Sequence, residues 1–117
     1  MKYMLLMYAS ESEEPKTPEE YQAIAQAFTN LRQELSAAKV LLSSNGVDPI
    51  ANATTVRVRE GKTLITDGPF AETHEQLGGY FVLDCKDLDE AIRWAEKIPT
   101  AQYGSIEIRP LWSPNKK

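Results

Sequence analysis

The residues that could carry chemistry gather in one segment, residues 66 to 80, which reads TDGPFAETHEQLGGY. Asp67 stands directly before Gly68 and Pro69, where a strand is expected to end. A carboxyl group in that position could transfer a proton as a general acid or base. Asp at the start of a turn also commonly accepts hydrogen bonds from backbone amides two or three residues further on. Asp67 is therefore the candidate catalytic residue, with a structural role in the turn as the alternative.

Other residues of this segment, and one arginine before it, could line a pocket for a small molecule. Glycines permit close approach of a ligand to the backbone, although loop glycines more often supply a positive φ or a bulge. An arginine could bind an anionic ligand, although Arg57 and Arg59 also fit a solvated strand face. Aromatic residues beside a sheet are usually core. The candidate ligand-binding residues are Arg57, Gly68, Pro69, Phe70, Glu72, His74 and Tyr80.

Several classes of site find little support. Glu72, His74 and Glu75 could donate to a metal, but neighbours on one loop seldom converge without a second segment. No metal site and no cofactor are predicted, and His74 by itself fits a solvated loop side chain. No nucleophilic triad can be assembled from one histidine and Cys85, which fits a small buried thiol. The segment also lacks the Lys-Ser or Lys-Thr pair of a phosphate-binding loop.

The composition bounds the class of protein. A chain of 117 residues with 42% hydrophobic and 26% charged residues is typical of one globular domain. The expected domain covers residues 1 to 112, followed by a polar tail at 113 to 117. A net charge of -4 argues against a nucleic-acid partner. The apolar start is too short for a membrane span and lacks a cleavage site, so a cytoplasmic location is expected.

Hydrophobic spacing and capping residues predict the elements. Strands are expected at residues 2 to 9, 40 to 44, 54 to 59, 62 to 66, 80 to 85 and 104 to 112, and helices at 18 to 39 and 88 to 98. Residues 67 to 79 are expected to form a long loop. The buried helix stripes are expected to be Tyr21, Ile24, Phe28, Leu31, Leu35 and Ala38, and Leu88, Ala91, Ile92, Ala95 and Ile98.

This order predicts an α+β fold of the ferredoxin-like βαββαβ type with an inserted β-hairpin. Two helices can cover only one face of the sheet. The first strand and the strand at 80 to 85 are apolar on both faces, so the second face needs another cover. A two-fold partner would supply it, and a homodimer is therefore expected.

The run TDGPFAETHEQLGGY, with KYMLLMY, ATTVRVREGK, DLDEAIRWAEKIP and GSIEIRPLW around it, resembles the YCII-related family of the DGPF type over nearly the whole chain. The resemblance implies a dimeric α/β-barrel protein with a pocket near the motif and, for most members, no established activity. It also implies a sigma factor as a partner in some cases. His74 stands where relatives usually have a lysine, and residues 37 to 40 where they commonly have a glycine, which suggests another helix C-cap.

Two functions from different classes fit these features. The first is a small-molecule-binding dimer with a pocket at the DGPF loop, in which Asp67 transfers a proton or anchors the ligand; whether it is an enzyme stays open. A long loop of specific sequence favours this function. The second is a non-catalytic regulatory or interaction module beside a sigma factor, favoured by the missing catalytic constellation.

Overall fold

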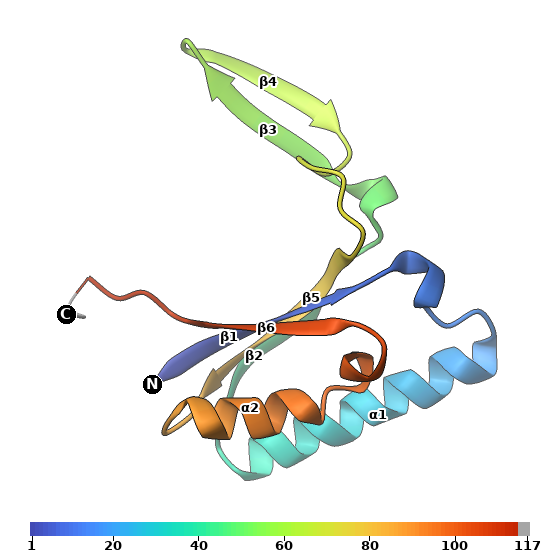
Figure 1. Ribbon diagram of the computed structural model, residues 1–117, viewed down its shortest axis with the longest axis vertical. Helices are drawn as coiled ribbons and strands as arrows, with labels where there is room; N and C mark the ends of the chain where they lie inside the picture. The colour runs from blue at the N-terminus through green and yellow to red at the C-terminus, as the bar shows by residue number, and fades with distance from the viewer. Residues whose placement is uncertain (115–117) are drawn as a thin grey trace.

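The computed structural model describes residues 1–114, in which two helices lie on one side of a four-stranded antiparallel sheet (Figure 1). The sheet order is β2-β5-β1-β6, and a separate two-stranded sheet is formed by β3 and β4. The strands are β1 (Lys2–Ala9), β2 (Leu41–Gly46), β3 (Thr54–Arg59), β4 (Lys62–Asp67), β5 (Gln76–Asp84) and β6 (Ser105–Pro110). The helices are α1 (Pro18–Ala37) and α2 (Leu88–Glu96), with 3-10 turns η1 (Glu11–Glu13), η2 (Ile50–Asn52) and η3 (Pro99–Gln102). The ferredoxin-like fold with an inserted hairpin is confirmed.

Helix α1 begins where its capping residues predict. The Glu20 amide donates to the Thr17 hydroxyl at 3.1 Å, and Pro18 occupies the first turn. The Glu20 carboxylate accepts a hydrogen bond from the Lys16 amide at 2.9 Å, one residue before the Thr17 amide that a reciprocal capping box would use. The start of the helix is confirmed, with the reciprocal contact shifted by one residue.

The end of α1 differs from the expectation of another C-cap. The Lys39 amide donates to the Ser36 carbonyl at 3.0 Å, and the Val40 amide to the Leu35 carbonyl at 3.1 Å. These bonds form a Schellman motif, which usually places glycine where Lys39 stands. Lys39 adopts the left-handed conformation itself, with φ 64°. The usual cap is therefore kept, at a strain on the order of 1 kcal/mol.

The core lies between the helices and the sheet. Its buried hydrophobic residues are Tyr3, Leu5, Met7, Leu31, Leu35, Val40, Phe81, Leu83, Cys85, Ala91, Ala95 and Ile98. Both expected stripes were wrong in part, because Tyr21 and Ala38 at the two ends of the first stripe, and Leu88 and Ile92 of the second, are exposed, whereas Ile98 is buried. For Tyr21 the reason is visible in Figure 1, where the first turns of α1 extend beyond the end of α2. No second helix covers that part of α1.

The strand that follows the DGPF motif begins earlier than expected. Residues 76 to 79, expected in a loop, belong to β5, so the connection spans only residues 68 to 75. This connection is called the motif loop below. Gly78 and Gly79 lie inside β5, and a Cβ atom on Gly79 would lie 2.7 Å from the Asn45 carbonyl oxygen and 3.1 Å from Gly46 Cα. Glycine at position 79 lets β2 approach β5 closely. From the sequence alone, such a strand glycine cannot be distinguished from a glycine in a turn.

The hairpin of β3 and β4 projects away from the four-stranded sheet (Figure 1). Glu60 and Gly61 form its turn with φ values of 54° and 76°, as in a type I′ turn. The apolar side chains Val56, Val58 and Ile65 are 60%, 60% and 68% exposed. These side chains form an apolar surface that one chain does not cover. Two strands alone are only marginally stable in water.

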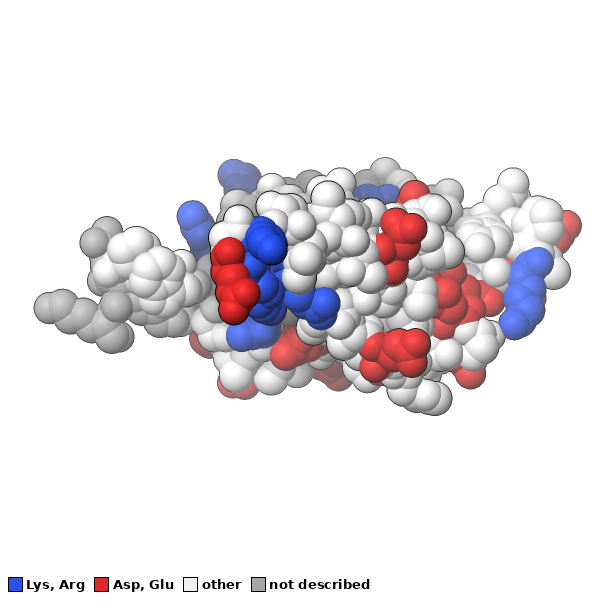
Figure 2. Space-filling model, turned by 90° about the horizontal axis from the view of Figure 1, so that it is seen from above, with Lys and Arg blue, Asp and Glu red and all other residues white. Residues whose placement is uncertain are grey.

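The sheet face opposite the helices, called the open face below, carries half-buried side chains along β1 and β5. They are Met4, Leu6, Tyr8, Tyr80 and Val82. Seen from the hairpin side, the molecule shows mostly uncharged residues, with a group of Lys and Arg side chains left of the centre, further Lys and Arg side chains toward the edges, and several separate Asp and Glu groups (Figure 2). The expected tail has neither helix nor strand at Ser113 and Pro114, and its residues 115 to 117 lie outside the described residues.

Candidate functional site

The candidate residues of the DGPF motif lie on the hairpin and the motif loop. Asp67 ends β4, Gly68 has φ 100°, and Phe70 is 77% exposed. Pro69, Glu72 and His74 are exposed as well. Within one chain these side chains do not form an enclosed site.

Backbone contacts and a threonine hold the start of the motif loop. The Gly68 amide donates to the Ala53 carbonyl at 2.7 Å, and the Thr55 hydroxyl donates to the Gly68 carbonyl at 2.7 Å. The Arg57 guanidinium donates to the Phe70 carbonyl at 3.2 Å. Arg57 is thus brought to the motif, where it contacts the backbone. The Asp67 carboxylate, in contrast, accepts no hydrogen bond from the residues that the structure describes.

Replacing Asp67 by alanine should therefore leave the thermal midpoint within about 1 °C of wild type, as for surface residues without partners. Thr55→Val should instead speed hydrogen exchange of the Gly68 amide, because it removes the bond that fixes the Gly68 peptide. Differential scanning calorimetry and exchange measured by NMR check the two expectations. A fall of several degrees in Asp67→Ala, absent in Asp67→Asn, would show that the carboxylate caps its turn after all.

Tyr80 lies apart from the motif loop, in a polar cluster on the open face. Its hydroxyl accepts a hydrogen bond from the Asn45 amide at 3.0 Å and shares a hydrogen bond of 3.3 Å with the Ser43 hydroxyl. The pairing of β2 with β5 places these residues side by side. The bonds from Ser43 and then Asn45 lower the pKa of the Tyr80 hydroxyl. This cluster is a polar anchor on an otherwise apolar strip.

A half-open cavity lies elsewhere, between α1 from Tyr21 to Arg32 and the ends of β1, β2 and β5. This cavity has a volume of about 410 Å³, within the usual range of small-molecule sites. Its apolar and aromatic wall includes Met7, Tyr8, Tyr21, Ile24, Phe28, Val47, Leu77 and Tyr103. Of the motif, only the end at residues 76 to 78 contributes to this wall. The candidates Arg57, Asp67 to His74 and Tyr80 are not among the lining residues.

The cavity also contains polar groups without partners. The Thr100 hydroxyl oxygen is buried and forms no hydrogen bond with any described residue. Burial, followed by the negative charges of Glu14 and Glu13, raises the pKa of the Tyr103 hydroxyl. In the sequence, the lining residue Tyr21 showed only the spacing of a buried stripe and gave no signal of the cavity. The cavity itself needs segments far apart in sequence to meet, which periodicity does not predict.

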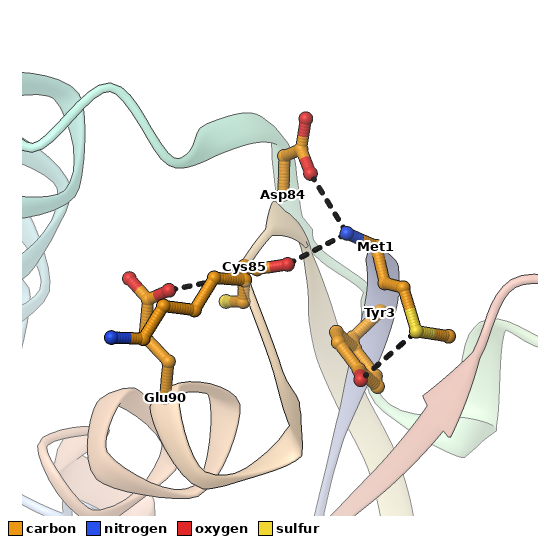
Figure 3. A network of polar contacts seen from close by, with 6 residues as sticks. Met1, Tyr3, Asp84, Cys85 and Glu90 are labelled. Atoms are coloured by element: carbon orange, nitrogen blue, oxygen red, sulfur yellow. Dashed lines mark hydrogen bonds and ion pairs between the residues drawn. The ribbon is translucent and has the colours of Figure 1, made fainter.

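Cys85 is buried behind a network of polar contacts (Figure 3). The amino group of Met1 donates to the Cys85 carbonyl at 2.7 Å, and the Glu90 carboxylate accepts from the Lys86 amide at 2.8 Å. Burial, then the charge of Glu90, raises the pKa of the Cys85 thiol to about 11. A thiol that stays protonated near neutral pH is a poor nucleophile. Cys85 is therefore a core residue, as its apolar neighbours predicted.

Among residues 1–114 no group of three His, Cys, Asp or Glu side chains is placed to hold a metal ion. No helix in the same residues is long and apolar enough to cross a membrane.

Comparison with known proteins agrees with the fold and the motif. The family model of the YCII-related domain matches residues 1–115. The chain belongs to the YCII-related family. One member, an uncharacterized protein of Rhizobium meliloti strain 1021, is 36% identical over 114 residues, covering 95% of this chain and 92% of the relative. The family assignment confirms the resemblance seen in the sequence. Because this relative is itself uncharacterized, it suggests no activity for the chain.

Proposed function

We propose that this YCII-related protein binds a small organic molecule in the cavity between α1 and the sheet, and that it does so as a homodimer. The cavity carries this proposal, because it has the size of a small-molecule site, is largely apolar, and has in its wall a buried hydroxyl that lacks a partner among the described residues. Residues 76 to 78 connect the motif to its wall. A buried, protonated Cys85 fits a reducing, cytoplasmic location.

The homodimer is proposed to form through the open face. A sheet packed by helices on one face only leaves its second face to a further layer. Leu6 and Tyr80 are register partners at the centre of the half-buried strip. Asp67 does not line the cavity, so its role as a proton-transfer group would need a second copy, packed beside the hairpin, to enclose its carboxylate and bring a substrate to it.

A bulky side chain that fills the cavity should strongly weaken ligand binding. Ala25 is an exposed residue that lines the cavity, so Ala25→Trp inserts an indole into the space without removing a core side chain. Fragments found by saturation-transfer NMR should bind Ala25→Trp at least about tenfold more weakly, because the indole occupies their volume. Ala23→Trp is the matched control, since Ala23 is exposed on the same helix and does not line the cavity. If both variants bind the fragments equally, and the fragments change the NMR chemical shifts of residues 67 to 74, the binding site is at the motif loop instead.

An alternative function, that of a protein interaction module, is favoured by the exposed apolar hairpin. Val56, Val58 and Ile65, together with Phe70, present a surface that a partner protein could cover. A transcription partner of the sigma-factor type is implied only by the resemblance to relatives. Fragments that fail to bind, together with a hairpin that becomes protected from exchange on adding a purified partner, would favour this function.

A further inference from the structure

More acidic than basic side chains line the cavity, and some of them already form hydrogen bonds within the protein. Three carboxylates, Glu11, Glu14 and Asp48, line it against one guanidinium, Arg32. Glu11 already accepts a hydrogen bond from the Ile50 amide at 3.0 Å, and Asp48 one from the Asn52 side chain at 3.4 Å. Glu14 and Arg32 form no side-chain hydrogen bond or ion pair with the residues that the structure describes. They are the charged groups that remain available to a ligand.

Glu14 and Arg32 come from separate segments of the cavity lining. Glu14 precedes α1, whose first lining residue is Tyr21, whereas Arg32 lies eleven residues further along the helix. Eleven residues of α-helix span about 16 Å. An exposed guanidinium that far from Tyr21 is largely screened, at physiological salt, from a charge bound beside Tyr21. A charge bound beside Tyr21 is therefore little affected by Arg32.

The part of the cavity wall that contains Glu14 also contains other groups that can bind a cation. Tyr103 lines the cavity together with Glu14, and burial, followed by the negative charges of Glu14 and Glu13, raises the pKa of its hydroxyl. Thr100 lies in η3, which directly precedes Tyr103, and its carbonyl accepts a hydrogen bond from the Gly104 amide at 2.7 Å. The Thr100 hydroxyl oxygen is buried and has no partner among the described residues. A carboxylate, two hydroxyl oxygens and the rings of Tyr103 and Tyr21 are groups that attract an ammonium ion.

We propose that the cavity binds an organic cation, a primary amine on an aromatic or aliphatic body, with its ammonium group between Glu14, Thr100 and Tyr103. The body lies against Ile24, Phe28 and the beginning of β5. This inference rests on the proposed small-molecule function and names its ligand class. The ammonium donates to the acceptors Glu14 and Thr100, and the apolar body excludes water from the wall.

Three probes with one aromatic body test the head group: phenethylamine, 2-phenylethanol and 3-phenylpropanoate. In NMR titrations at low salt, the amine should bind most tightly and the carboxylate least. Glu14→Gln should weaken the amine by roughly three- to fivefold, the effect of one partly exposed ion pair, and leave the alcohol unchanged. Glu96→Gln is the matched control, since Glu96 is exposed on α2 and does not line the cavity. Added salt should weaken the amine alone.

The opposite order of affinities would overturn the inference. Tighter binding of 3-phenylpropanoate, lost in Arg32→Gln, would show an anion site beside Arg32. Equal binding of all three probes would show that charge does not select the ligand. In both cases the small-molecule function stands. Failure of every probe, while fragments sensitive to Ala25→Trp still bind, would reject the amine class alone; failure of all fragments would reject the proposed function itself.

Discussion

Replacing Gly104 by alanine should lower the free energy of unfolding by about 3 kcal/mol and the thermal midpoint by roughly 10 °C. A Cβ atom at this position would lie 2.2 Å from the Tyr8 carbonyl oxygen and 3.0 Å from the Ala9 Cβ atom. The backbone has little freedom to retreat. The Gly104 amide is bonded to the Thr100 carbonyl at 2.7 Å, and Ser105 is paired with Tyr8 in the sheet. Thermal unfolding followed by circular dichroism measures the effect.

The matched control is Gly78→Ala, whose new Cβ atom would be 3.9 Å from its nearest neighbour, the Met7 carbonyl oxygen. It should cost less than about 1 kcal/mol. Because Gly104 fixes η3 against the end of β1, its replacement should also displace Thr100 and Tyr103 and weaken ligand binding in the cavity. A midpoint within a degree or two of wild type would show that η3 can shift at little cost, and that the cavity wall is not held as we describe.

Elements specified by local signals were predictable from the sequence. The strand at Lys2–Ala9 agrees residue for residue, and α1 begins directly after Thr17. The hairpin follows from alternating residues on both sides of the Glu60-Gly61 turn. Each of these signals lies within a few residues of the structure that it specifies, so one sequence contains all the information needed.

Features that depend on distant segments were not predictable. Gly79 is a strand residue because Asn45 and Gly46 approach it from β2, and no pattern within the motif reveals that approach. Tyr21 has the spacing of a core residue but lies where α1 passes beyond α2. The cavity combines residues from 7 to 103, so its position required the topology. Motif residues such as Asp67 and His74 were chosen by type, which carries no information about enclosure.

Introducing a lysine at Leu6 should convert the proposed homodimer into monomers at micromolar concentration. Leu6 lies on β1 at the centre of the open face, between Tyr80 on β5 and Glu107 on β6. A two-fold axis through this face would bring both copies of the new charge into the interface, where removing each ammonium group from water costs several kcal/mol even beside the Glu107 carboxylate. The dissociation constant should rise by about a hundredfold or more, as for a central interface residue. Sedimentation velocity measures the change.

The monomer should tolerate Leu6→Lys better than the dimer does, because a lysine stem can lie along the sheet with its ammonium group in water. Gln33→Lys is the control, since it adds the same charge at an exposed position of α1, on the other side of the sheet. A dimer that survives Leu6→Lys must use another surface, and the exposed Val56, Val58 and Ile65 of the hairpin are then the next to mutate. A wild-type protein that sediments as a monomer would leave the open face to a different partner, and would remove the enclosure that a catalytic role of Asp67 requires.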